Sequence, residues 1–300
     1  MRKQWMIWMA CLALSGAAQA FVPQAGTWVV SSELNGKPGR GLAIDMQNDT
    51  LVMQMYAYEQ NGQPTFYMAS APVAYVPAGP GTVDEHIIVD ARLGRYVGGR
   101  YLGSGDLSGT ESGSPGNVRL RFTSGTDGFI TLPGEPEKPI KRYQFGYPAA
   151  AESLLGLWSF VSAWENGTVE YDTVELVRVA PGTPSGNGIV VSATGQYTCE
   201  QQVVGGDAGR VLCVKMRSGT SGEAVRDYWM SYSVNQGEGD WSNVNDRSIG
   251  ALYAQRLMTG NGKITGLLRQ QPVDAAGQAG GDDALRAALT AARERKQAGR

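Results

Sequence analysis

The chain contains little of the material from which most catalytic sites are built. Its 300 residues include one histidine and three cysteines. A catalytic zinc site usually takes three protein ligands, and a serine hydrolase needs a histidine base beside a serine on a tight turn. The single histidine, His86, lies in the segment DEHIIVD, and we find no Gly-x-Ser-x-Gly turn. We therefore expect His86 to be a polar residue at a strand end, and we expect neither a metal site nor a cofactor.

Neither sign of charge dominates the chain. Lys and Arg number 26 against 28 Asp and Glu, for a formal net charge of −2. Nucleic-acid-binding domains normally carry a basic face, so this balance gives no support to that class of partner. Hydrophobic residues make up 42% of the chain, with 13 Tyr, 7 Trp and 6 Phe, which is enough to build packed cores and argues against disorder.

The first twenty residues, MRKQWMIWMACLALSGAAQA, have the three parts of a secretory signal peptide. Arg2 and Lys3 form the positive start, an apolar run follows, and Ala-Gln-Ala precedes the cleavage that we expect before Phe21. The apolar run is shorter than the ~20 residues needed to span a bilayer, and no later run is long enough. We expect an exported bacterial protein of the periplasm or cell exterior, with no transmembrane segment in the mature chain. Lipid attachment at Cys11 is the alternative.

The two cysteines of the mature chain are placed to form a disulfide, which persists in an oxidising compartment. Cys199 and Cys213 lie in YTCEQQVV and RVLCVKM, with VGGDAG between them. A hairpin folded about Gly206 places Cys199 directly opposite Cys213, which brings their Cβ atoms to roughly 4.5–5.5 Å, near the range of a disulfide. No Cys-x-x-Cys motif is present, so we predict a structural bridge rather than a redox site.

Alternation of apolar and polar residues with a period of two runs from Gly26 to about Met258. In NVRLRFTS, for example, Val118, Leu120 and Phe122 point to one side and the two arginines to the other, which is typical of a strand buried on one face. Evenly spaced short strands of this kind favour an up-and-down barrel or a sandwich. In the first half the strands that we expect include 97–103. In the second half we expect 157–164, 169–179, 188–193, 196–204, 210–217, 225–234 and 249–258.

The strand pattern divides into two parts of similar strand number. It is interrupted at 148–152, after which Gly156-Leu157-Trp158 repeats the earlier Gly26-Thr27-Trp28. We therefore predict an all-β protein with two consecutive antiparallel, up-and-down or calycin-like β-barrel domains and a short C-terminal helix. The predicted segments are a signal peptide (1–20), domain 1 (21–149), domain 2 (150–259), a flexible linker (260–281) and a C-terminal helix or tail (282–300).

The C-terminal segment ALRAALTAARERKQ predicts a helix that begins at Asp282 or Asp283. Its basic residues gather toward the C-terminal end, where they suit the helix dipole. An alanine-rich stripe lies along one side: Leu285, Ala288, Leu289 and Ala292. A docking or membrane-surface helix and a solvated, partly frayed tail both fit this pattern. We favour the solvated tail, because the stripe has few large apolar residues.

Residues 39–69 read GRGLAIDMQNDTLVMQMYAYEQNGQPTFYMA. This segment resembles an exported proteobacterial β-repeat module of unknown function, in which a Gly-rich start and an apolar strand lead to Tyr-Asp-x-x-Gly-x-Pro-x-Trp-Tyr. GNVRLRFTSGTDGFITLPG and PIKRYQFG are similar to its later strands, so the resemblance covers roughly 26–147. Phe66 replaces the usual Trp, and Arg40 replaces an aromatic residue. The matching positions are Tyr58, Gly62, Pro64 and Tyr67. The resemblance implies an exported β-domain and no active site.

Aromatic residues recur in both predicted domains. Aromatic faces with a few polar partners suit sugars or small apolar molecules, whereas the same residues can equally fill a core. We assign no catalytic residue. The candidate ligand-binding residues, which would line a barrel mouth or cup, are Tyr56, Tyr58, Phe66, Tyr67, Tyr228, Trp229 and Tyr232.

Three functions remain open from the sequence. We favour a non-enzymatic envelope protein that binds a small ligand, a glycan or a protein partner. A secreted hydrolase would need two carboxyl groups placed across a sugar, and its candidates are Asp84, Asp90, Asp172 and Glu175. A structural or assembly role in the cell envelope would use the C-terminal helix to dock a partner.

Overall fold

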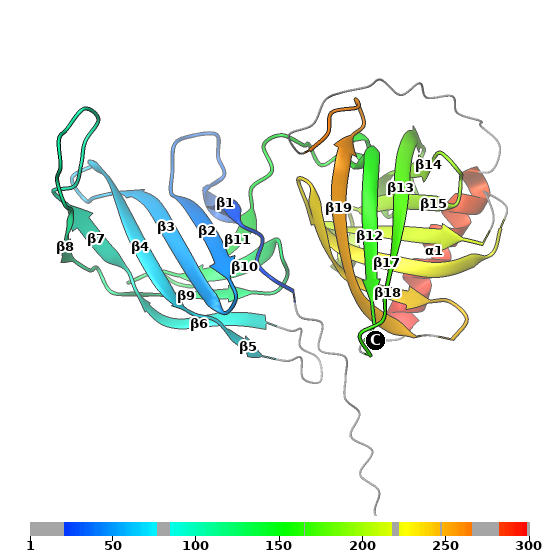
Figure 1. Ribbon diagram of the computed structural model, residues 1–300, viewed down its shortest axis with the longest axis horizontal. Helices are drawn as coiled ribbons and strands as arrows, with labels where there is room; N and C mark the ends of the chain where they lie inside the picture. Colours follow the sequence, from blue (N-terminus) through cyan, green and yellow to red (C-terminus); the bar gives the residue numbers. More distant parts are fainter. Residues whose placement is uncertain are drawn as a thin grey trace, which may run out of the picture.

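The computed structural model describes residues 21–76, 85–164, 166–217, 222–246, 248–265 and 282–298, with 85–90 described as backbone only. Within these ranges the chain is almost entirely β-structure, with nineteen strands, three short 3-10 helices and one α-helix. This confirms the predicted all-β class. The strands form two domains, which stand side by side in Figure 1. The predicted signal peptide and most of the predicted linker lie outside the described residues.

Domain 1 is a curled sheet of eleven strands in the order β5-β6-β9-β10-β11-β1-β2-β3-β4-β7-β8. β6 continues into β7 through Leu93 although the two strands stand far apart in that order, so the sheet curls back on itself (Figure 1). The bounds are β1 (Gly26–Val30), β2 (Gly41–Gln47), β3 (Thr50–Tyr58), β4 (Pro64–Pro72), β5 (Ala74–Val76), β6 (Glu85–Arg92), β7 (Gly94–Val97), β8 (Thr110–Gly113), β9 (Asn117–Phe122), β10 (Asp127–Thr131) and β11 (Lys138–Arg142).

The core of domain 1 follows from the alternation in its strands. In β3 every second side chain is buried, among them Leu51, Met53 and Met55, while their neighbours are exposed. These side chains fill the inside of the curl together with Trp28 and Phe122, whose rings meet edge to face with centroids 5.3 Å apart. The strand predicted at 97–103 is wrong, because β7 ends at Val97 and the chain turns there into the loop before β8.

Domain 2 is a closed barrel of eight antiparallel strands in sequence order, which confirms the predicted up-and-down topology. Closure comes from pairing of the last strand with the first, so the barrel has no free edge. The bounds are β12 (Gly156–Ala163), β13 (Val169–Ala180), β14 (Gly186–Ser192), β15 (Tyr197–Gln202), β16 (Arg210–Met216), β17 (Ala224–Ser233), β18 (Gln236–Asn243) and β19 (Ile249–Thr259).

One strand of this barrel, β18, was not predicted. Its sequence, QGEGDWSN, is rich in residues that are poor strand formers. It becomes a strand because it pairs along its length with β17 on one side and with β19 on the other. Gly239 fits this crowded position, since a Cβ atom there would lie 1.9 Å from the backbone oxygen of Trp229. The tertiary pairing therefore outweighs the local preference.

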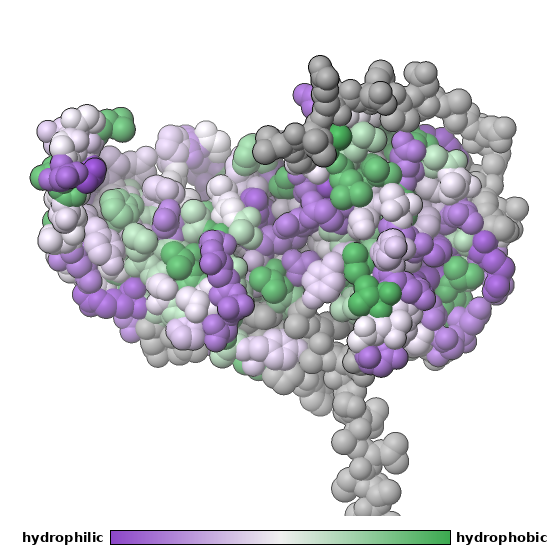
Figure 2. Space-filling view, viewed as in Figure 1, coloured by the Kyte–Doolittle hydropathy of each residue, from purple (hydrophilic) through white to green (hydrophobic). Residues whose placement is uncertain are grey.

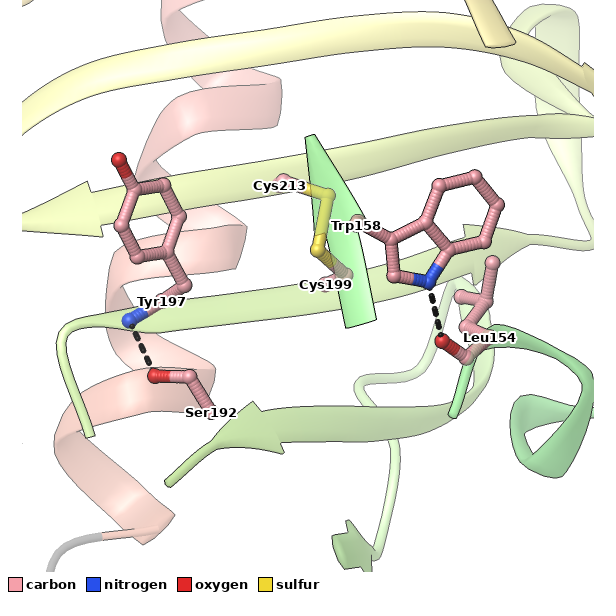
Figure 3. Close-up of a disulfide and its surroundings, with 6 residues drawn as sticks. All are labelled: Leu154, Trp158, Ser192, Tyr197, Cys199 and Cys213. Carbon is pink, nitrogen blue, oxygen red and sulfur yellow. Dashed lines mark hydrogen bonds between the residues drawn. A yellow bond between two sulfur atoms is a disulfide. The ribbon is translucent and has the colours of Figure 1, made fainter. Parts of the chain in front are cut away.

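The interior of the barrel in domain 2 is packed with side chains around the disulfide. Cys199 and Cys213 are register partners in β15 and β16, with Cα atoms 4.0 Å apart, which confirms the predicted bridge. Figure 3 shows the bridge beside Trp158, whose indole nitrogen donates to the Leu154 carbonyl at 2.8 Å. Large buried side chains fill the rest, among them Phe160, Tyr228, Met230 and Trp241.

The repeated Gly-x-Trp tripeptide marks the same structural feature in both domains. Gly26 and Gly156 have positive φ values of 130° and 126°, a conformation that L side chains rarely adopt. Two residues on, Trp28 donates to the Gln24 carbonyl at 2.9 Å, as Trp158 does to Leu154. Each domain therefore begins its first strand in the same way.

The C-terminal helix, α1 (Asp282–Ala298), packs on the outside of the barrel (Figure 1). Its alanine-rich stripe is fully buried at Leu285, Leu289 and Ala292. The stripe lies on outward-facing apolar side chains of the barrel, including Leu212, Val214 and Trp229. The favoured solvated tail is therefore wrong. The barrel supplies the large apolar residues that the helix lacks.

Candidate functional site

The seven candidate ligand-binding residues lie in three different environments. Tyr56, Tyr58 and Phe66 are exposed on the outer face of domain 1. Tyr67 points to the other side of β4, and its hydroxyl lies 3.4 Å from a carboxylate oxygen of Glu59. The remaining three are buried in domain 2: Tyr228, Trp229 and Tyr232. Only the group on domain 1 offers exposed aromatic surface to a ligand.

The three aromatic residues in domain 2 stabilise the barrel. Tyr228 and Tyr232 point inward, and burial raises the pKa of each hydroxyl to about 12. The Tyr228 ring packs on Phe160 with centroids 5.5 Å apart. Trp229 points outward but is covered by α1, and the Lys296 Nζ atom lies 4.8 Å from the centre of its indole. The barrel mouth or cup expected from the sequence does not include these residues.

Three exposed rings form a row across neighbouring strands of domain 1. Tyr56 in β3 stands opposite Phe66 in β4. β4 pairs with β7 so that Tyr67 faces Arg95, and the same register sets Phe66 opposite Tyr96. The planes of the Phe66 and Tyr96 rings differ by 10°, with centroids 6.4 Å apart. We call Tyr56, Phe66 and Tyr96 the aromatic row. Since neighbouring strands are ~4.8 Å apart, the row spans roughly 10 Å.

Gly94 leaves room for the Tyr96 ring on the outer face of β7. A Cβ atom on Gly94 would be 3.1 Å from the Tyr96 hydroxyl oxygen and 3.2 Å from Cε2, so the ring covers this glycine. The Phe66 ring is nearly parallel to the Tyr96 ring. Both residues keep more than a third of their surface exposed, at 42% and 37%. Both rings therefore remain partly open to the solvent on the outer face.

The sheet face around the aromatic row has almost no charge. The outer positions of β2, β3, β4 and β7 hold one charged residue, Asp45. In contrast, outer positions of β9 and β11 carry Arg119, Arg121 and Lys141. Figure 2 shows pale and green residues over β3 and β4, with purple residues along the edge of the domain. The aromatic row therefore lies on the neutral side of domain 1.

A pocket of about 430 Å³ opens at the β3–β4 turn. Its lining is polar: Glu59, Gln60, Asn61 and Arg95. Arg95 Nη1 donates to Glu59 Oε1 at 3.1 Å, which fixes the two side chains. Burial of the Tyr67 hydroxyl, aided by the neighbouring Glu59 carboxylate, raises the pKa of Tyr67. Arg95, the register partner of Tyr67, reaches this pocket from the face of the sheet opposite to the aromatic row, so the pocket is separate from the row.

The carboxylates considered for a hydrolase do not form a catalytic pair in the described residues. Asp172 and Glu175 are three residues apart in β13 and so project to opposite faces. Burial works against ionisation of Asp172, but hydrogen bonds from Lys215 and Tyr228 outweigh it and lower the pKa of Asp172. Glycoside hydrolysis needs a carboxyl that stays protonated. Asp84 and the side chains of Asp90 and His86 lie outside the described residues.

Sequence reasoning missed Tyr96, Arg95 and Glu59. Tyr96 fell just outside the strand expected at 97–103, and only the pairing of β4 with β7 brings it beside Phe66. The sequence signal that could have identified Tyr96 is its spacing from Gly94, which places a glycine and a tyrosine on the same face of a strand. Within the described ranges, no three of the residues His, Cys, Asp and Glu gather as a metal site. No helix there has the length and apolar character to cross a membrane.

Comparison of the chain with protein-family models, with curated proteins and with solved structures gives no match in any of the three. The interpretation of the site therefore depends on its own geometry.

Proposed function

We propose that this protein is exported to the bacterial cell envelope, or secreted, and binds a neutral glycan chain on the aromatic row of domain 1 without catalysing a reaction. The observation that carries the proposal is the register of Tyr56, Phe66 and Tyr96, whose exposed rings lie on adjacent strands. A row of exposed rings on adjacent strands matches the extended shape of a sugar chain. It does not enclose a ligand as a deep pocket would.

Chemistry supports a sugar as the ligand. The C–H faces of sugar rings pack on aromatic faces, while sugar hydroxyls need hydrogen-bonding partners. The rings of the aromatic row supply the first, and the hydroxyls of Tyr56 and Tyr96, with Gln54 on the same face of β3, supply the second. Asp45 is the one charged residue on the outer positions of β2, β3, β4 and β7. An anionic polysaccharide would find no cation there to pair with. A neutral polysaccharide would bind with little cost from the desolvation of charged groups.

Two features support export. Residues 1–20 have the composition of a signal peptide, and the disulfide between Cys199 and Cys213 is compatible with an oxidising compartment. The resemblance of residues 26–147 to an exported β-repeat module agrees with this location. Cell fractionation of the producing bacterium, with the intact mass of the recovered chain, tests export. A full-length chain found only in the cytoplasm contradicts it.

Binding is tested with the chain from residue 21 and a panel of neutral and anionic polysaccharides, by co-sedimentation and affinity electrophoresis. The variant Tyr56→Ala/Phe66→Ala removes two rings, and Tyr171→Ala/Tyr253→Ala removes two exposed rings of domain 2 as a matched control. We expect binding to a neutral glycan that the first variant weakens at least about tenfold, equivalent to ~1.4 kcal/mol, and that the control leaves unchanged. Equal binding by both variants, or no binding to any neutral glycan, contradicts the proposal.

A further inference from the structure

Glu238, in β18, has a carboxylate at the junction between the two domains. It accepts a hydrogen bond from the backbone N–H of Val22 at 3.0 Å. Gly125 of domain 1 lies close to the same group, since a Cβ atom there would be 3.0 Å from Oε1. Burial raises the pKa of Glu238, and the Val22 N–H is the one interaction that opposes this rise. Among the described residues, then, this half-buried carboxylate has a hydrogen bond but no cation.

Partial removal of a carboxylate from water without a positive partner is costly. The one group that donates a hydrogen bond to this carboxylate is the N–H of Val22, and Phe21 directly precedes Val22 in the chain. The Phe21 side chain packs against the core of domain 1, so its position is set by apolar contacts. Backbone nitrogens of successive residues are at most about 3.6 Å apart. The nitrogen of Phe21 therefore lies within about 7 Å of the Glu238 carboxylate.

We propose that the site at Glu238 binds the α-ammonium group that appears on Phe21 when residues 1–20 are removed, and that this ion pair fastens domain 1 to the barrel. Hydrolysis of the Ala20–Phe21 bond consumes one water and leaves a carboxylate on Ala20 and an ammonium on Phe21. An α-amine has an ordinary pKa of about 7.7–8.0 and is mostly protonated at neutral pH. The inference rests on the export proposed above, because export is what supplies the cleavage.

Glu238 lies where an ion pair would connect domain 1 to the β17–β18 hairpin of the barrel. The end of domain 1 already holds the β17–β18 turn, because Gln144 donates to the Tyr232 carbonyl at 2.9 Å and accepts from the Val234 N–H at 3.5 Å. Val22 and Glu238 attach the start of domain 1 to the same hairpin. Processing would thus fix this hairpin from both ends of domain 1.

Four chains test the inference in vitro with defined ends. Two begin at Phe21, with Glu238 or with Glu238→Gln, and two carry Gly-Ser before Phe21, again with Glu238 or Glu238→Gln. The extension moves the ammonium away and turns the Phe21 nitrogen into an amide. At pH 7 we expect the extension to lower the unfolding temperature by about 2–4 °C when residue 238 is Glu, and to have no effect when it is Gln.

A second readout does not depend on stability. Acylation of the Phe21 amine by a succinimidyl ester is expected to be at least about threefold slower with Glu238 than with Glu238→Gln, because an ion pair protects the amine. An extension effect that persists in Glu238→Gln, or equal acylation rates, overturns the inference. Because these chains are made with fixed ends, failure of export leaves this test intact. Recovery from cells of a chain cut at another bond overturns the inference while leaving export standing.

Discussion

Arg256 lies against Trp158 in the barrel, with its guanidinium carbon 4.4 Å from the ring centroid, and the two residues are register partners across β19 and β12. The same guanidinium donates to the carbonyls of Leu155, at 2.5 Å, and Ser153. It thereby fixes the 3-10 helix at Ala151–Leu154 over one end of the barrel. In domain 1, Arg142 is likewise the register partner of Trp28. The two domains therefore join their first and last strands through the same pair of residue types.

The Arg–Trp pair gives a comparison between the domains. Arg256 is buried, so Arg256→Ala leaves several carbonyl groups without a donor and should lower the free energy of unfolding by about 3 kcal/mol. Arg142 donates to the Ala25 and Thr27 carbonyls in a more exposed place, where water can replace it. Arg142→Ala should cost about 1 kcal/mol. Urea unfolding followed by tryptophan fluorescence measures both, and equal losses would contradict the difference in burial.

The disulfide should stabilise the barrel and leave domain 1 unaffected. Cys199 and Cys213 are 14 residues apart, and closing a loop of this length is worth about 3 kcal/mol. Reduction, or the variant Cys199→Ala/Cys213→Ala, should therefore lower the unfolding midpoint of domain 2. Hydrogen exchange resolves the two domains by peptide. An unchanged barrel after verified reduction would refute the prediction.

Lys296 makes the docking of α1 depend on pH. Its ammonium lies 3.3 Å from Asp240, but burial dominates and lowers the pKa of Lys296 from 10.5 to about 8. Between pH 8 and 10.5 the Lys296 amine has lost its proton in the folded chain but keeps it in the unfolded chain. The free energy of unfolding therefore rises with pH across this window, by up to about 1.4 kcal/mol per pH unit. We expect Lys296→Met to abolish this rise in urea titrations at pH 8, 9 and 10. Lys141→Met, at an exposed lysine, should preserve it.

Gly94 should control glycan binding through the orientation of Tyr96. A methyl group at Gly94 meets the Tyr96 ring at 3.1–3.3 Å, so Gly94→Ala should lift the ring and weaken binding roughly fivefold, about 1 kcal/mol, with little change in thermal unfolding. Gly41, opposite Tyr56 at the other end of the row, has no atom within 4 Å of its Cβ position. Gly41→Ala is the matched control in calorimetric titrations. If it weakens binding as much, ring orientation is not the cause.

Local patterns predicted much of the fold and little of the site. The cysteine pairing follows from a short hairpin, because Cys199 and Cys213 are equidistant from its turn, and the structure confirms it. β18 could not be predicted in this way, since its sequence is a poor strand and only its two neighbours make it one. The aromatic row depends on the pairing of β4 with β7, which brings together segments 28 positions apart, as Tyr67 and Arg95 show.

The sequence by itself determined which side chains share a face of each strand, because the period of two is a property of the extended backbone. It did not determine which outward face stays open. Tyr56 and Trp229 both occupy outward positions flanked by inward apolar residues, yet Tyr56 is 57% exposed and Trp229 is 2% exposed. The difference arises because α1, far along the chain, covers one face and nothing among the described residues covers the other. Only tertiary packing decides which aromatic residues remain available to a ligand.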